Sequence, residues 1–105
     1  MNLKMYILIK DSVPNDLIPL IAAHASLAGY LEWEHSEEVK QWINPGPFYK
    51  VICKVNNKEF ANAKLVEYNK LMYSSELDNQ EVALVFKPRF EWPKMFRYFK
   101  LWKMN

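Results

Sequence analysis

His24 is the residue of this sequence best suited to general acid–base chemistry, because an unperturbed imidazole changes its charge near neutral pH. It stands in an alanine-rich segment that follows a strand-like run. Asp11 ends that run, and Glu76 and Asp78 follow much later in the chain. Their carboxylates could share a hydrolytic pocket with the imidazole. We therefore take His24, Asp11, Glu76 and Asp78 as the candidate catalytic residues.

Each of these four residues also has a purely structural interpretation. His24 could pack on a sheet and donate one hydrogen bond near a strand end, since a buried imidazole without a partner is costly. Asp11 could cap the helix that follows it. Glu76 and Asp78 fall in a predicted hairpin tip, where acidic residues usually shape the turn.

A helix should position His24. Turn and cap residues place its start between Pro14 and Pro19, and it should run to about Glu34. Its alanines and Gly29 would allow it to lie close on a sheet. Apolar residues recur in it at helical steps of three and four, which predicts one buried stripe with the histidine in its middle. The stripe consists of Leu17, Leu20, Ile21, His24, Leu27, Ala28 and Leu31.

The remaining segments predict an α/β fold in one domain, residues 1–105. The runs KMYILIK at 4–10 and VALVF at 82–86 are typical of central strands. Two more strands are predicted at 48–55 and 72–77, and helices at 36–43, 57–71 and 93–102. The short connection at 78–81 forces the last two strands to pair antiparallel. The element order is β-α-(α)-β-α-β-β-α, an α/β sandwich.

Positive charge is concentrated at the C-terminus. Residues 87–105 contain six basic residues and one acidic residue, a net charge of +5, whereas residues 1–86 carry a net charge of −3. Cations that alternate with aromatic rings are typical of surfaces for single-stranded RNA. An amphipathic helix on a sheet or a protein interface has the same pattern. With one residue from the first strand, the candidate binding residues are Lys10, Arg89, Lys94, Arg97 and Lys100.

Composition argues against several other classes of protein. The single cysteine, Cys53, cannot form an internal disulfide, and we expect a buried, reduced thiol. One cysteine and two histidines show no metal-ligand spacing, and two glycines are too few for a phosphate or dinucleotide loop. We therefore expect neither metal nor cofactor. No signal peptide and no run of about 18 apolar residues is visible, so we expect a cytoplasmic protein with no membrane contact.

The order of these segments resembles the type 2 peptidyl-tRNA hydrolases. MYILIK, Asp11, a proline-bearing cap and AAHASLAGY are similar to the first strand and helix of that family, and YKVICKV and VALVFKP are similar to its second and last strands. The most specific part is the stretch from His24 to Tyr30. The resemblance implies a mixed four-stranded sheet in the order 2-1-4-3 with one antiparallel strand and helices on both faces. It also implies a homodimer that cleaves the ester joining peptide to tRNA.

The sequence departs from this family at two catalytic positions. Leu17 stands seven residues before His24, where family members carry a lysine. Their Asp-Ala-Gly-x-Thr loop is replaced by SSELDNQE, in which Glu76 and Asp78 are the possible substitutes. Such a hydrolase needs a cation to hold phosphate or developing negative charge. We therefore expect a divergent member without the full catalytic set. The alternatives are an active peptidyl-tRNA ester hydrolase and an RNA- or protein-binding module that uses the basic C-terminal helix.

Overall fold

A mixed five-stranded sheet forms the centre of the computed structural model, which describes residues 2–102. The strand order is β3-β4-β1-β2-β5. β1 and β2 are parallel, whereas β4 is antiparallel to both of its neighbours and β5 is antiparallel to β2. The strands are β1 (Lys4–Lys10), β2 (Tyr49–Val55), β3 (Asn69–Ser74), β4 (Gln80–Phe86) and β5 (Lys100–Leu101). The first four follow the expected order, and β5 corrects the expectation of a four-stranded sheet.

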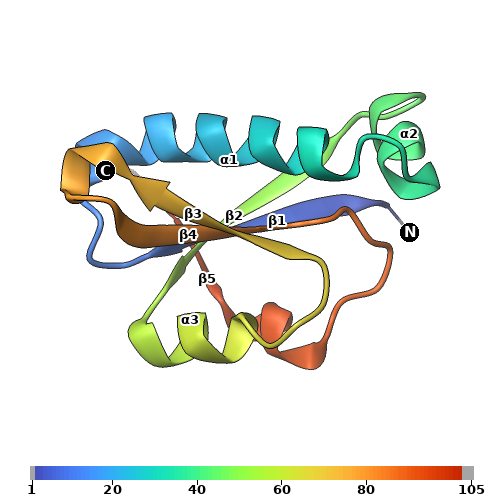
Figure 1. Ribbon diagram of the computed structural model, residues 1–105. Coiled ribbons are helices and arrows are strands. Elements are labelled where there is room, and N and C mark those ends of the chain that lie inside the picture. Colours follow the sequence, from blue (N-terminus) through green and yellow to red (C-terminus); the bar gives the residue numbers. More distant parts are fainter. Residues whose placement is uncertain (1, 103–105) are drawn as a thin grey trace.

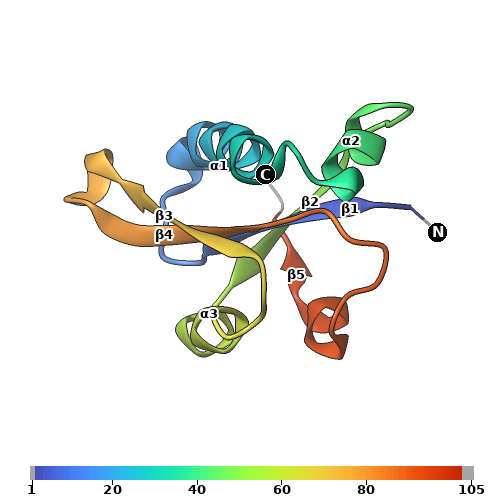
Figure 2. The same ribbon diagram turned by 45° about the vertical axis from the view of Figure 1, so that its right-hand side comes forward.

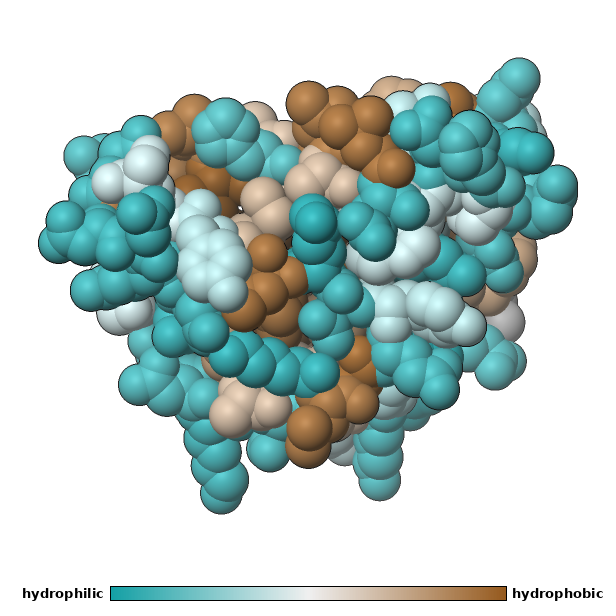
Figure 3. All heavy atoms as spheres, viewed as in Figure 1, coloured by the Kyte–Doolittle hydropathy of each residue, from teal (hydrophilic) through white to brown (hydrophobic). Residues whose placement is uncertain are grey.

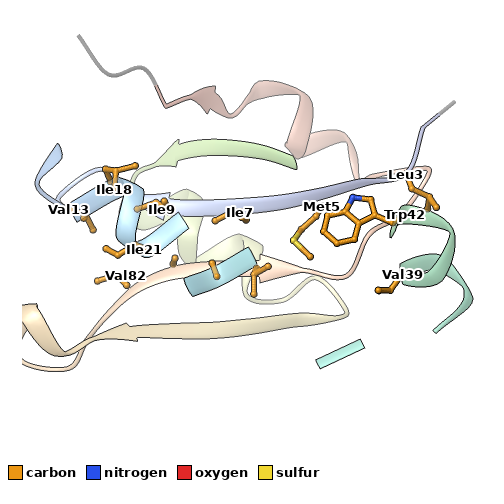
Figure 4. Close-up of a cluster of buried hydrophobic side chains, with 13 residues drawn as sticks. Leu3, Met5, Ile7, Ile9, Val13, Ile18, Ile21, Val39, Trp42 and Val82 are labelled. Carbon is orange, nitrogen blue, oxygen red and sulfur yellow. The ribbon is translucent and has the colours of Figure 1, made fainter. Parts of the chain in front are cut away.

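Helices cover both faces of the sheet (Figures 1 and 2). α1 (Ile18–Trp33) and α2 (Glu37–Ile43) lie on one face, which we call the upper face. α3 (Asn57–Ala63) and a 3-10 helix at Lys94–Tyr98 lie on the lower face. Alternate residues of each strand point to opposite faces, so the sheet carries two separate cores. The upper core joins Met5 and Ile7 of β1 to α1 and to Trp42 of α2 (Figure 4).

Helix α1 packs on the sheet through its small residues. At Gly29 an added Cβ would lie only 2.8 Å from Met5 Cε and from Val85 Cγ2, so helix and strands approach closely at this point. The buried residues of the helix are Ile18, Ile21, Ala25 and Gly29.

The predicted buried stripe of α1 was therefore wrong in most of its residues, although Ile21 is buried and Leu17 packs against the upper core. Leu20, Leu27 and Leu31 are 39%, 59% and 56% exposed, and His24 is exposed as well. Figure 3 shows apolar side chains gathered along the upper edge of the molecule, over α1. Apolar residues surround this helix on nearly every side, so their spacing alone does not select the buried face. The close approach at the small residues selects it.

Helix α3 is shorter than the predicted helix at 57–71. It begins with the expected capping box, in which Asn56 Oδ1 accepts from the Glu59 amide at 2.8 Å and Glu59 Oε1 accepts from the Asn56 amide at 2.9 Å. It ends at Ala63, and Tyr68 then takes a left-handed conformation with φ 61°. β3 begins at Asn69. Its backbone N–H and C=O groups form hydrogen bonds with β4, so they do not need the hydrogen bonds of a longer helix.

The predicted C-terminal helix at 93–102 was also wrong. Lys94–Tyr98 forms a short 3-10 segment, and Lys100–Leu101 then adds β5 to the outer edge of β2. Phe96 is buried, with its ring centroid 5.0 Å from that of Tyr6 and 5.2 Å from that of Phe86. Packing of large rings under the sheet favours this compact turn over a regular helix.

Candidate functional site

A cleft of about 280 Å³ lies between α1 and the β3–β4 hairpin. Two of the four candidate catalytic residues, His24 and Glu76, line it. Leu20, Met72 and Val82 form apolar parts of its wall, and Ser74, Ser75 and Asn79 supply polar groups. The cleft is therefore lined by one imidazole, one carboxylate, one amide and three residues that carry a hydroxyl, Tyr73, Ser74 and Ser75, beside apolar side chains.

The hairpin tip positions Glu76 toward the helix. Residues Ser75–Leu77 form a 3-10 turn, and Asp78 and Asn79 follow with φ 55° and 59°. The left-handed region is tolerated by Asp and Asn better than by other residues with a side chain. The Asn79 amide then donates to the Ser74 carbonyl at 2.8 Å and closes the turn.

Two serine hydroxyls hold the Glu76 carboxylate. Ser74 Oγ donates to Glu76 Oε1 at 3.2 Å, and Ser75 Oγ lies 3.4 Å from the same oxygen. Ser74 is only 5% exposed, so its hydroxyl is a fixed part of the cleft wall. Sequence reasoning missed both serines. The available signal was their position next to an acid at a predicted turn, since Ser side chains commonly bond to groups within two residues.

His24 lies on the helix side of the cleft and is exposed. The structural interpretation of a buried ring that donates one hydrogen bond was therefore wrong. No hydrogen bond joins His24 to Glu76 or to another side chain among residues 2–102. The imidazole is free to meet a ligand that enters from solvent.

Asp11 and Asp78 lie outside the cleft. Asp11 follows β1, its amide donates to the Val55 carbonyl at 2.8 Å, and its side chain is exposed. It caps neither the 3-10 turn at Asn15–Leu17 nor α1, since neither has a side-chain cap. Asp78 occupies the left-handed turn, as the structural interpretation of the hairpin tip predicted.

The five candidate binding residues do not converge on the cleft either. The Lys10 ammonium lies 4.7 Å from the centroid of the Phe60 ring on the lower face. Arg89 lies over Trp92 at 5.3 Å and lines a second cavity, of about 520 Å³, near Lys87 and Tyr68. The other three, Lys94, Arg97 and Lys100, are exposed along the C-terminal segment.

The charge of the cleft limits its chemistry. No lysine or arginine among residues 2–102 lines it. Ester hydrolysis develops negative charge on oxygen, which donors or cations must stabilise. Glu76 would instead repel that charge. In the part of the chain that the structure describes, no group of three or more His, Cys, Asp and Glu residues could hold a metal ion.

Two side chains associated with the lower core, Cys53 and Tyr6, have raised pKa values. Burial raises the pKa of the Cys53 thiol to about 12, and the charge of Glu59 adds a smaller effect in the same direction. Burial also raises the pKa of Tyr6, with Cys53 as a second cause. Cys53 is a free, buried cysteine, as the sequence predicted. A thiol held in its neutral form is a poor nucleophile, so it belongs to the core.

Comparisons with known proteins do not identify a family. No family model matches the chain, and no curated protein matches it. Among residues 2–102, no helix has both the length and the apolar character required to cross a membrane.

Proposed function

We propose that this chain is a divergent type 2 peptidyl-tRNA hydrolase-like protein that has the scaffold of that family and lacks its hydrolase activity. The order of the first four strands, 3-4-1-2 with β4 antiparallel, agrees with the sheet that the resemblance implies. The alanine-rich segment is a helix on that sheet, and its histidine faces the β3–β4 hairpin.

The observation that carries the proposal is the charge of the cleft. Among the residues that the structure describes, its lining contains the carboxylate of Glu76 and no lysine or arginine. Leu17, at the position of the family's lysine, is partly buried against the upper core. Without a cation the cleft lacks the group that would hold a phosphate or stabilise the transition state of ester cleavage.

A turnover assay tests this proposal. Purified protein is incubated with peptidyl-tRNA, and the released tRNA is measured for the parent, His24→Ala and Glu76→Gln. His35→Ala serves as the matched control, because His35 is also exposed but lies outside the cleft. We expect all four proteins to give the rate of buffer alone. A parental rate that falls on His24→Ala and remains on His35→Ala would establish an active hydrolase instead.

A second candidate function is RNA binding through the C-terminal segment. Lys94, Arg97 and Lys100 are exposed, no carboxylate among residues 2–102 pairs with them, and the neighbouring Tyr98 is 71% exposed. Unpaired cations beside an exposed ring suit the phosphates and bases of a single strand. The basic C-terminal helix expected for this role is replaced by the 3-10 turn and β5.

Retention of single-stranded RNA at rising salt tests the second candidate. Replacing Lys94, Arg97 and Lys100 by alanine should abolish a salt-sensitive retention of the parent. Replacing the exposed Lys4, Lys40 and Lys58 is the control that changes net charge equally. Equal losses in the two triple variants would indicate attraction by net charge alone and would exclude a dedicated surface.

A further inference from the structure

The upper face contains a groove of about 510 Å³ on the opposite flank of α1 from the cleft. The helix forms one wall with Ala23 and Leu27, where small side chains leave the space open. Ile43 and Phe48 form the opposite wall. Ile52 of β2 lies on its floor. The groove is therefore bounded on three sides by apolar side chains.

The exposure of these walls is unusual for a protein surface. Leu27 is 59% exposed, Phe48 49% and Ile43 42%, although they converge on one hollow. Contiguous exposed apolar surface is rare unless it contacts a ligand or a partner. Most small-molecule sites are apolar hollows of about 300–1,000 Å³ with few polar groups. The volume of this groove falls in that range.

In the described part of the chain, one cation, Lys50, lines the groove. Its ammonium lies 4.6 Å from the centroid of the Phe48 ring and 5.5 Å from that of Trp42. It donates to the Phe48 carbonyl at 3.2 Å, and no carboxylate among residues 2–102 lies within ion-pair distance of it. An ammonium has three donors, so Lys50 retains hydrogen-bonding capacity for an anion.

The position of Lys50 is well defined by its neighbours. The indole of Trp42 is buried, and its Nε1 donates to the Tyr49 carbonyl at 2.8 Å, which fixes the ring that faces the ammonium. Lys50 and Lys54 both project from the upper face of β2, but Lys54 lies over Trp102 at 4.9 Å and does not line the groove. Within residues 2–102, Lys50 is therefore the one unpaired cation that lines the apolar hollow.

We propose that this groove binds a small monocarboxylate with an aliphatic body, of the class of medium-chain fatty acids. The carboxylate accepts hydrogen bonds from the Lys50 ammonium, and the chain lies between Leu27 and Phe48. A single cation suits a single anionic group. This inference does not depend on the cleft of His24 and Glu76, because the two sites share no lining residue.

Titration with decanoate below its micellar concentration tests the proposal. Binding is followed by calorimetry and by NMR shifts of α1 and β2, with decanol and acetate as the probes that lack the charge or the chain. Lys50→Gln should weaken decanoate binding about tenfold, the effect of one charge-assisted hydrogen bond. Lys54→Gln, the matched control on the same strand, should leave the affinity unchanged. Ala23→Trp, at an exposed helix position, should fill the groove and abolish binding.

Several results would overturn the proposal. Equal affinity for decanol and decanoate would show that Lys50 does not bind the carboxylate. An equal loss of decanoate affinity in Lys50→Gln and Lys54→Gln would show the same. Binding that persists in a folded Ala23→Trp variant would place the ligand elsewhere. A concentration-dependent dimer that Ala23→Trp disrupts, in a parent that does not bind decanoate, would assign the groove to a second copy of the chain. Binding only of an apolar peptide ending in a free carboxylate would assign it to a protein partner.

Discussion

Gly29 is the position where a single methyl group tests how α1 lies on the sheet. Alanine at an open helix position would stabilise the protein by about 1 kcal/mol relative to glycine. Here the new Cβ would lie 2.8 Å from Met5 Cε and from Val85 Cγ2. The methionine end can move, but Val85 belongs to the central strand β4 and is fully buried. Overpacking of this kind costs about 1–3 kcal/mol, so Gly29→Ala should lower the free energy of unfolding by about 1 kcal/mol.

Denaturant unfolding of a double-mutant cycle measures this effect. Ala23→Gly, at an exposed position of the same helix, measures the difference in helix propensity between alanine and glycine without a packing effect. It should lower the free energy of unfolding by about 1 kcal/mol. Val85→Ala removes the atom that the new methyl group meets, so it should be less harmful in the Gly29→Ala background, with a coupling of about 1 kcal/mol. A more stable Gly29→Ala protein together with an additive cycle would refute the close approach of α1.

Three further predictions concern other parts of the fold. Asn56→Ala removes the capping box of α3 and should lower the free energy of unfolding by about 1 kcal/mol, whereas Asn56→Asp should retain most of it, as measured by thermal unfolding. Asn79→Val places a β-branched residue at φ 59° and should destabilise the hairpin by about 1–2 kcal/mol, while Asn79→Gly should be tolerated. The pKa of Cys53 is about 12 in the folded protein against an ordinary 9.0, so only the unfolded state loses this proton between these values. Stability should therefore fall as pH rises through that window, less steeply in Cys53→Ala, and thiol alkylation at pH 9 should be slow until denaturant is added.

The parts of the fold that the sequence predicted correctly depend on local chemistry. Continuous apolar runs identified β1 and β4 as central strands, and the short connection between β3 and β4 set their antiparallel pairing. Ser36 was correctly expected to begin α2, where its Oγ accepts from the Val39 amide at 3.2 Å. Such signals act over a few residues, so they can be read without knowledge of the tertiary structure.

The errors all involve contacts between distant segments. The buried face of α1 depends on Met5 and Val85 meeting Gly29, and the spacing of the leucines contains no information about those partners. The C-terminal turn depends on rings from β1 and β4 that pack against Phe96. Local signals also identified only part of the cleft. The sequence correctly selected His24 and Glu76, but it also proposed Asp11, which lies outside the cleft. Which acids approach a given helix is decided by sheet order and by the conformation of the hairpin tip.

The short pairing of β5 with β2 has a consequence for the behaviour of the protein at high concentration. Among residues 2–102, Lys100 and Leu101 alone pair with the outer side of β2, opposite Lys54 and Cys53. The Trp102 amide adds one bond to the Ile52 carbonyl at 2.9 Å. Brief detachment of these residues would expose a row of unpaired amides and carbonyls to other molecules. The pairing of β5 therefore reduces aggregation through edge-to-edge pairing of β2 with strands of other molecules.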